Sequence, residues 1–231
     1  MDKLNPFLDG KLLIVDKQIN WTSFDVVNKI RYAIKNKYTL KKIKVGHAGT
    51  LDPLATGVLI ICTGKKTKTI AQYLNQDKEY TGKIKLGSTT PSFDLETSID
   101  SHYDVPEIND QVINALIKKF SGELDQVPPN YSAKRIDGKR AYDLARANQD
   151  LKLSPNKIFI KELSLELSAD KTLSFRCKCS KGTYIRALAR DIGLALNSGA
   201  FLLQLRRIKS GNFSIDQAKS VDQWIEIIKS S

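Results

Sequence analysis

A single carboxylate, Asp52, lies in a loop of glycine and proline residues just before an apolar segment at 58–62. Glycines flank His47 in the same loop and permit backbone conformations that other residues avoid, while Pro53 restricts the backbone directly after the aspartate. Loops at the end of a rigid element often carry the groups that bind or react. An isolated Asp-Pro pair is usually an ordinary turn, so Asp52 becomes a candidate reactive group only together with motifs elsewhere in the chain.

Those motifs are present. Residues 46–59 resemble the sequence that surrounds the catalytic aspartate in the TruB family, the tRNA pseudouridine-55 synthases. Five further segments resemble motifs of the same family, in the same order: Lys17 with residues 22–27, and residues 78–80, 131–134, 179–186 and 205–207. The resemblance extends from about residue 11 to about residue 211. Several motifs in the family order identify the chain as a member more firmly than any single motif does.

The resemblance implies the pseudouridine synthase fold, an α+β architecture with a long, mixed, largely antiparallel sheet, flanking helices and a central RNA-binding cleft. It implies isomerisation of uridine to pseudouridine in the T-loop of tRNA, at position 55, on a base flipped out of its stack. The reaction cuts the glycosidic bond, turns the uracil and rejoins it through C5. Because this involves no redox step and no group transfer, we expect no cofactor and no metal.

The resemblance also assigns roles to the site residues. Asp52 would be the nucleophile or the base that removes a ribose proton, and the sequence leaves both roles open. Arg186 would be its partner, because a carboxylate kept ionised in a base-sized pocket needs a nearby cation. Tyr80 would stack on the target base and take part in proton transfer. RNA contacts are expected from six further residues: His47, Lys17, Tyr184, Lys181, Arg206 and Arg207.

The spacing of Tyr184 and Arg186 makes a checkable prediction. The two residues are two apart, so an extended segment directs both side chains to one face, whereas a helix separates them. We therefore predict an extended backbone over residues 183–186. Without the resemblance, a core aromatic and a surface cation would be the commoner interpretations.

Charge and composition agree with an RNA partner. The 231-residue chain has a net charge of +12, with ten Lys and Arg against four Asp and Glu in residues 1–49, and nine against one in residues 171–211. Clustered basic charge is typical of proteins that bind polyanions. No apolar run is long enough to span a membrane, and the first residues lack a secretory signal, so we expect a cytoplasmic protein.

The three cysteines indicate neither a disulfide framework nor a structural zinc site, because their number is odd and no Cys-x-x-Cys pair occurs. We expect plain buried thiols, with Cys177 and Cys179 on opposite faces of a strand.

Hydrophobic periodicity predicts strands at 11–15, 58–62, 80–86, 157–167, 173–179 and 201–208. It predicts helices at about 22–35, 67–74, 112–120, 138–148, 185–196 and around 224–228. In the first of these helices, the buried stripe is expected to contain Phe24, Val27, Ile30 and Ile34. Residues 88–106 are loop-like and are the best candidate for a mobile insertion. Irregularly mixed strands and helices favour an α+β fold with a mixed or antiparallel sheet.

We expect one catalytic domain over residues 1–231, with a core at about 11–211 and an RNA-facing insertion at about 88–150. The chain stops about twenty residues after the last motif, so we expect no C-terminal PUA domain of the kind found in longer members. We expect a monomer that binds the T arm of tRNA. Two departures, Gln18 where the family has proline and Pro91-Ser92 in place of an acidic loop position, are expected to affect substrate choice more than the reaction.

Other functions remain open to comparison. A family relative could act on a different RNA uridine, and an RNA-binding or RNA-folding protein could use the same basic cleft without catalysis. A pure binder, however, has no need of Asp52, Tyr80 and Arg186 together. A nucleotide-binding enzyme is suggested only by residues 64–67, and this interpretation fails because a P-loop needs glycine where Leu59 stands.

Overall fold

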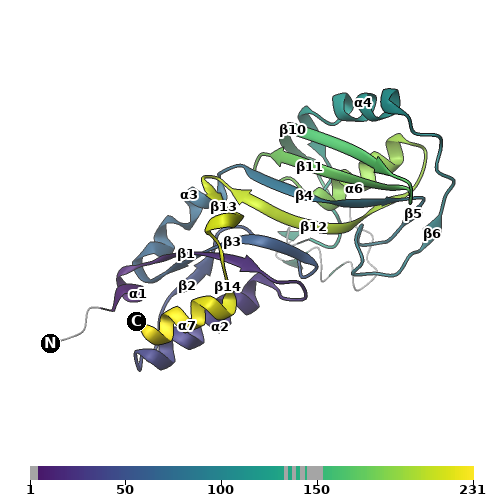
Figure 1. Ribbon diagram of the computed structural model, residues 1–231. Helices are drawn as coiled ribbons and strands as arrows, with labels where there is room; N and C mark the ends of the chain where they lie inside the picture. The colour runs from purple at the N-terminus through teal and green to yellow at the C-terminus, as the bar shows by residue number, and fades with distance from the viewer. Residues whose placement is uncertain (1–4, 133–134, 137–138, 141–143, 145–152) are drawn as a thin grey trace. The chain divides into compact units, whose positions relative to one another are not determined.

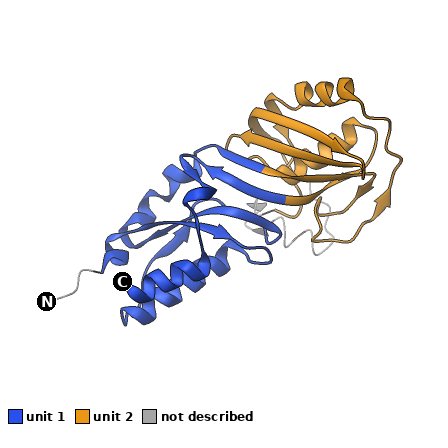
Figure 2. Ribbon diagram, viewed as in Figure 1, with its two compact units in different colours: residues 1–80, 205–231 blue, residues 81–204 orange. Residues whose placement is uncertain are grey.

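The computed structural model describes residues 5–132, 135–136, 139–140, 144 and 153–231. Among these residues, ten strands form one mixed sheet in the order β14-β1-β3-β12-β4-β11-β10-β7, with β13 paired to β12 and β2 to β3 (Figure 1). The chain divides into two compact units, residues 1–80 with 205–231, and residues 81–204 (Figure 2). Strands β4 (Lys78–Leu86) and β12 (Ala200–Ser210) contribute residues to both units.

The first unit contains most of the chain's N-terminal elements and its C-terminal helix. Its strands, besides parts of β4 and β12, are β1 (Leu12–Lys17), β2 (Val45–His47), β3 (Ala55–Thr63), β13 (Phe213–Ser214) and β14 (Lys219–Ser220). Its helices are α1 (Pro6–Asp9), α2 (Ser23–Lys37), η1 (Gly64–Thr69), α3 (Ile70–Leu74), η2 (Ile215–Gln217) and α7 (Val221–Ser230).

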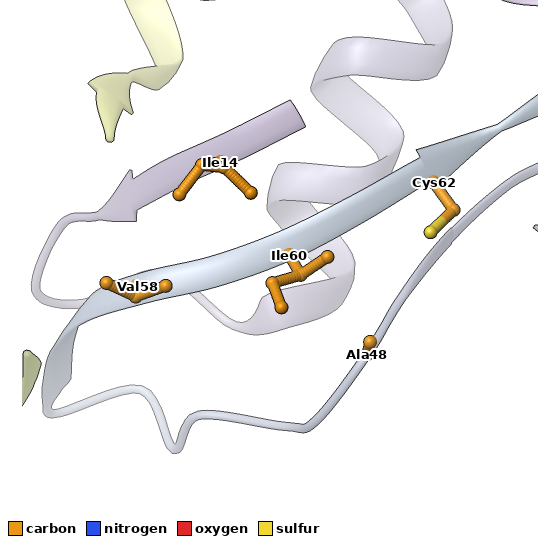
Figure 3. Close-up of a cluster of buried hydrophobic side chains, with 5 residues drawn as sticks. All are labelled: Ile14, Ala48, Val58, Ile60 and Cys62. Carbon is orange, nitrogen blue, oxygen red and sulfur yellow. The ribbon is translucent and has the colours of Figure 1, made fainter. Parts of the chain in front are cut away.

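Strand β3 is central to this unit. It pairs antiparallel with β1 and β2 and parallel with β12, and almost all of its residues are buried. A strand covered in this way is nearly uniformly apolar, which explains the run of branched residues at 58–62. Figure 3 shows the cluster that forms on one side of it, contributed by β1, β3 and the chain after β2: Ile14, Ala48, Val58, Ile60 and Cys62.

Helix α2 begins where the sequence predicts. The Thr22 side chain accepts a hydrogen bond from the Asp25 backbone, and the Asp25 carboxylate accepts one from the Thr22 backbone, which completes a capping box. The buried face of the helix contains Val26, Val27 and Ile30, followed by Ile34. Phe24, predicted to belong to this face, is instead 60% exposed and lies under the Arg31 guanidinium, 6.0 Å from the ring centroid.

Gly57 is required by the close approach of two strands. Its φ is +104°, and a Cβ at this position would lie 2.2 Å from the backbone oxygen of Arg207. Gly57 pairs with Lys17 of β1 on one side and with Arg207 of β12 on the other. Residues paired in register across a sheet project to the same face. The side chains of Lys17 and Arg207 are therefore directed to one face of the sheet, with no side chain between them.

The second unit contains strands β10 (Asn156–Ser168), β11 (Thr172–Cys179) and β7 (Gly122–Gln126), in antiparallel pairing. It also contains helices α4 (Asp110–Lys119) and α6 (Ile185–Ala195). Two further antiparallel pairs of short strands are β5 (Ser88–Thr89) with β6 (Ser101–His102), and β8 (Arg135–Ile136) with β9 (Lys139–Arg140). Helix α6 is amphipathic, and its apolar face is buried.

Most predicted elements are confirmed within a few residues. The predicted helix at 138–148 lies mostly outside the described residues, although residues 139–140 form strand β9. The segment at 88–106 is largely irregular and includes β5 and β6. The three cysteines are free and buried, as predicted. The prediction that Cys177 and Cys179 face opposite sides was wrong, because residues two apart on a strand share a face. The two thiols are hydrogen-bonded to each other, and this bond, together with burial, raises the pKa of Cys177.

Candidate active site

The loop that carries Asp52 connects β2 to β3, both of which pair in the sheet of the first unit. Its first part is fixed by burial, because Ala48 lies in the core and donates its backbone N–H to Ile60 O at 2.9 Å. Its end is fixed by a turn, in which Ala55 N donates to Asp52 O at 3.1 Å. Asp52 itself is partly exposed. The carboxylate is thus presented on a loop whose two ends are anchored.

Arg207 fixes the loop before Asp52. Its side chain is 1% exposed and donates to three carbonyl oxygens, Val58 O at 2.7 Å, Gly49 O at 3.0 Å and Thr50 O at 3.4 Å. A planar guanidinium can reach several acceptors in one plane, which a lysine ammonium cannot do with the same geometry. The cation therefore ties β12 to both the loop and the start of β3.

Lys17 fixes the loop after Asp52. Its ammonium is fully buried and donates to Trp21 O at 2.6 Å, Gln18 O at 3.0 Å and Pro53 O at 3.3 Å. Burial lowers the pKa of Lys17 to about 8, the negative charge of Asp52 opposes this shift, and the positive charge of Arg207 adds to it. Asp52 is therefore the carboxylate whose charge acts most strongly on the buried Lys17 ammonium.

Ser23 holds the residue next to Asp52. Its hydroxyl accepts from Leu51 N at 2.9 Å and donates to Leu51 O at 3.1 Å, and both residues are buried. Ser23 is the first residue of α2, so the capped start of that helix is attached directly to the loop. Side chains from β12, α2 and β1 thereby fix the backbone on both sides of Asp52, which is the kind of rigid support that a reacting group needs.

Lys17 and Arg207 were predicted to bind RNA, but both side chains are buried and hold the backbone of the Asp52 loop. Neither charged group is at the surface, and each donates hydrogen bonds to backbone oxygens of the first unit.

Arg206, the neighbour of Arg207, projects to the opposite side of β12 and is half-exposed. It donates to both carboxylate oxygens of Asp16, at 2.7 and 3.1 Å. Arg206 can therefore reach a phosphate only if this exposed ion pair is shared or broken.

His47 ends strand β2 at the start of the loop. Burial, with a smaller contribution from the positive charge of Arg207, lowers the pKa of His47. Its Nδ1 is buried and has no hydrogen-bond partner among the described residues. A neutral imidazole beside the loop suits contact with an uncharged part of a ligand better than contact with a phosphate.

Tyr80 lies on β4 and is 8% exposed. The two residues before it are structural: the Lys78 ammonium donates to Tyr73 O and Leu74 O at the end of α3, and Glu79 pairs with Lys209 at 3.6 Å. The motif at 78–80 thus attaches strand β4 to its surroundings in the first unit. The stacking of Tyr80 on a target base stays a prediction.

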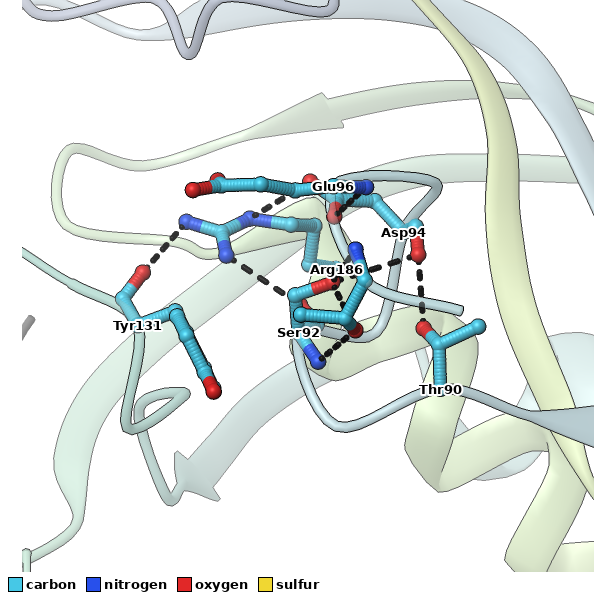
Figure 4. A network of polar contacts seen from close by, with 7 residues as sticks. Thr90, Ser92, Asp94, Glu96, Tyr131 and Arg186 are labelled. Atoms are coloured by element: carbon cyan, nitrogen blue, oxygen red, sulfur yellow. Dashed lines mark hydrogen bonds and ion pairs between the residues drawn. The ribbon is translucent and has the colours of Figure 1, made fainter. Parts of the chain in front are cut away.

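In the second unit, Arg186 is the centre of a polar network (Figure 4). The side chain is 4% exposed, its Nε lies 3.6 Å from Asp94 Oδ2, and it donates to Ser92 O at 3.1 Å and Tyr131 O at 2.9 Å. Asp94 is itself held, because its Oδ1 accepts from Glu96 N at 2.9 Å and its carbonyl from Thr90 Oγ1 at 2.6 Å. The loop at 90–94, predicted to concern substrate choice, supports the position of Arg186.

The predicted extended backbone over residues 183–186 was only partly right. Tyr184 is extended and precedes α6, but Arg186 belongs to the first turn of the helix. Buried Gln126 fixes the change of conformation, because its amide accepts from Tyr184 N at 2.8 Å and donates to Tyr184 O at 3.0 Å. The amphipathic pattern of α6 extends to its first residue and overrides the two-residue spacing. Lys181 is exposed in the turn before the helix.

The structure therefore places the predicted residues in two sets. Asp52, His47, Tyr80 and the cations that support the loop belong to the first unit, whereas Lys181, Tyr184 and Arg186 belong to the second. The pairing of Asp52 with Arg186 stays a prediction. Sequence reasoning missed the supporting residues Ser23, Asp94 and Gln126. Ser23 lies in a segment that resembles a family motif, and Asp94 lies in the loop at 90–94 that departs from the family pattern. No sequence signal indicates Gln126.

The titration of Lys17 gives the first testable prediction. Its pKa is about 8 in the folded chain and about 10.4 for an unperturbed lysine. Between these values the unfolded state binds a proton that the folded state has already released, so stability gained from this group rises with pH. We expect the free energy of unfolding of the parent, relative to Lys17→Met, to increase from pH 8 to pH 10 in urea titrations.

A direct NMR titration of the Lys17 side chain checks the same point without a variant. A midpoint near 8 is expected. A midpoint near 10.4, or a stability difference from Lys17→Met that stays constant between pH 7 and pH 10, contradicts the prediction.

A metal site and a membrane-spanning helix each have requirements that can be compared with the described residues. Among the described residues, no group of three or more His, Cys, Asp or Glu side chains is placed to bind a metal ion. Within the same residues, no helix has the length and apolar character needed to cross a membrane.

Comparison with known proteins agrees with this geometry. Residues 35–185 match the family described as TruB family pseudouridylate synthase (N terminal domain). A tRNA pseudouridine synthase B of Phocaeicola vulgatus is 51% identical over 95% of this chain and 94% of its own length. The protein of the same name from Flavobacterium johnsoniae is 47% identical over 96% of this chain and 98% of its own length.

Solved structures give the same result for the fold. The structure titled as a Cbf5-Nop10-Gar1 complex matches with a TM-score of 0.71 and 27% identity, over 95% of this chain. The archaeal box H/ACA sRNP Nop10-Cbf5 complex matches with a TM-score of 0.68 and 25% identity. This chain spans about half (54%) of the length of each of those two chains. With the large mixed sheet, the supported Asp52 loop and relatives of nearly equal length, the chain belongs to the TruB family of pseudouridylate synthases.

Proposed function

We propose that this protein isomerises a uridine in the T-loop of tRNA, at position 55, to pseudouridine. The observation that carries the proposal is the construction of the Asp52 loop, in which three side chains from different elements fix the backbone around one carboxylate. The name of the relatives, tRNA pseudouridine synthase B, supports tRNA as the substrate class.

The proposed chemistry needs only groups of the chain. The bond between C1′ of the ribose and N1 of the uracil breaks, a bond from C1′ to C5 forms, C5 loses a proton and N1 gains one. Asp52 acts at the sugar as nucleophile or as base, and the structure leaves these two roles open. Tyr80 stacks on the released uracil, and Arg186 supplies a permanent positive charge beside the carboxylate. His47, Tyr184, Lys181 and Arg206 contact the RNA around the target.

We further propose that both units form one catalytic domain, because Asp52 lies in the first and Arg186 in the second. The protein is proposed to act in the cytoplasm, where tRNA is modified, and as a monomer. A weaker proposal is that this protein acts on a uridine of another RNA. It is suggested by the box H/ACA title of a structural neighbour at 25% identity, whereas relatives named for tRNA reach 51%.

The test is conversion by the purified protein. A tRNA transcript is incubated without added metal or cofactor, and pseudouridine is mapped at single-nucleotide resolution. We expect one modified position, in the T-loop. A transcript with cytidine in place of that uridine is the matched control and should gain no pseudouridine. Modification of a different uridine, or of none, contradicts the proposal.

A further inference from the structure

The outer face of α2 is a feature of the first unit that the active site does not use. Helices α2 and α7 lie side by side (Figure 1), and their buried stripes account for only part of each surface. We use "the α2 outer face" for the residues of α2 and its preceding turn that line two neighbouring grooves: Asn20, Trp21, Asp25, Asn28, Lys29, Tyr32, Ala33, Asn36 and Lys37.

The two grooves share residues and so form one track. One groove, of about 450 Å³, lies between α2 and α7, where α7 adds Ile225 and Lys229 to its lining. The other, also of about 450 Å³, continues toward the start of α2 and the turn before it. Lys29 and Tyr32 line both. At 1.5 Å per residue, the helical part of the track, from Asp25 to Lys37, is roughly 18 Å long.

The charge along the track is positive. The groove between α2 and α7 contains Lys29, Lys37 and Lys229, and none of the described residues that line it is acidic. Lys229 is paired with Glu226 at 2.8 Å, whereas the Lys37 ammonium donates to the Lys229 carbonyl oxygen and keeps its charge without an acidic partner among the described lining residues. Lys29 and Lys37 are therefore the cations of this groove that are not paired with a carboxylate of its lining. Asp25, in the other groove, already accepts hydrogen bonds from the backbone and hydroxyl of Thr22. A uniformly negative ligand is therefore favoured over a peptide segment that carries both positive and negative charges.

An aromatic side chain lies in the middle of this positive track. Tyr32 is 66% exposed, although a tyrosine that served only the core would be covered. Lysines beside an exposed aromatic ring are the combination that binds nucleic acids, because the cations follow phosphates while the ring stacks on a base. Amide side chains at Asn28 and Asn36 add hydrogen-bonding groups that suit sugars and phosphates.

We propose that the α2 outer face is a second RNA-docking surface, which contacts substrate RNA outside the segment that enters the Asp52 site. This inference rests on the proposed function in taking RNA as the substrate. Ser23, at the beginning of α2, touches the Asp52 loop, and Lys29 to Lys37 lie roughly 9 to 21 Å farther along the helix. The surface is thus joined to the active site by one rigid element and lies beyond it.

The experiment measures affinity for a full-length tRNA transcript at several salt concentrations, with Asp52→Asn as the background so that the RNA stays unmodified. Two phosphate contacts are removed by Lys29→Ala with Lys37→Ala. The slope of log affinity against log salt should fall by about 1.4 to 1.8, and affinity at 100 mM salt should fall about tenfold. Tyr32→Leu should weaken binding about fivefold with little change in the slope, because stacking carries no charge.

The control is Lys11→Ala with Lys68→Ala, two exposed lysines of the same unit whose removal changes the net charge equally. This pair should leave the slope and the affinity at the values of the background protein. Thermal unfolding of every variant checks that it is folded. Equal slopes and affinities for the Lys29/Lys37 variant and the background overturn the inference, and so does an effect of the same size in the control.

The outcome is separable from that of the proposed function. If the parent modifies tRNA while removal of Lys29 and Lys37 changes nothing, the docking surface is wrong and the function stands. If the slope falls as expected but no uridine of tRNA is converted by the parent, the surface is an RNA-docking site and the proposed function is wrong. A surface used for a protein partner predicts unchanged RNA binding, which overturns the inference.

Discussion

Asp52→Asn should lower kcat for pseudouridine formation by at least a thousandfold, equivalent to about 4 kcal/mol of transition-state stabilisation. The substitution keeps the shape of the side chain and removes its charge and its basicity. The loop should survive, because its hydrogen bonds to Ser23, Lys17 and Arg207 involve the backbone of neighbouring residues and not the carboxylate. Single-turnover kinetics with excess enzyme measure the chemical step directly.

The matched control is the same substitution at an exposed aspartate, Asp104→Asn, which should leave kcat unchanged. RNA affinity of Asp52→Asn should stay close to that of the parent, since most binding energy for a nucleic acid comes from phosphate contacts elsewhere. Turnover by Asp52→Asn within tenfold of the parent would remove Asp52 from the chemistry. Loss of both turnover and affinity would instead indicate a collapsed loop.

The sequence predicted the elements well where one periodicity dominates. Strand β3 is buried by neighbours on both sides and is apolar over residues 58–62, and α2 has both a cap and an apolar stripe, so each was predicted within a few residues. Phe24 was assigned to the wrong face because its helical spacing matches the stripe, although it lies in the first turn and its side chain is 60% exposed. There it lies against the Arg31 guanidinium.

The site could be predicted as a set of residues but not as an arrangement. The resemblance identified Lys17 and Arg207, yet basic residues in an RNA-modifying family are naturally assigned to RNA. Only the structure shows that both cations lie inside the protein, because both residues pair with Gly57 in neighbouring strands and both side chains are buried. Register between distant strands is a tertiary property, and no local pattern encodes it.

A second limit concerns residues that support others. Gln126 holds the backbone of Tyr184 from a distance of 58 residues, and Asp94 pairs with Arg186 across 92 residues. Neither residue type is unusual, and neither sits in a spacing that indicates chemistry. Partners of this kind become visible only when the fold brings the two segments together.

Arg207→Lys should lower kcat about a hundredfold while changing KM less than about threefold. The substitution keeps the positive charge but replaces three fixed donors by one ammonium, which cannot reach Gly49 O and Val58 O with the same geometry. The loop before Asp52 then loses part of its support, and a shift of about 1 Å in the carboxylate is enough for an effect of this size. Because the side chain is buried, RNA contacts should be little affected.

Stability gives an independent measurement at the same position. Arg207→Met leaves buried carbonyl groups without donors, so we expect the free energy of unfolding to fall by about 3–5 kcal/mol. Arg206 is the control, since it is the adjacent residue of the same strand and has the same side chain. Its exposed pairing with Asp16 should contribute only about 0–1 kcal/mol, and Arg206→Met should cost no more than that.

The comparison of these two arginines separates positioning from RNA binding. If Arg207 only bound a phosphate of the RNA, Arg207→Lys would leave both kcat and KM nearly unchanged, because lysine also binds phosphates. If Arg206 contacts RNA, Arg206→Ala should lower the salt dependence of binding by about one unit of slope with no effect on stability. A kcat of Arg207→Lys within threefold of the parent would show that the Asp52 loop keeps its position without the guanidinium. In that case Ser23 and Lys17 would be sufficient to hold it.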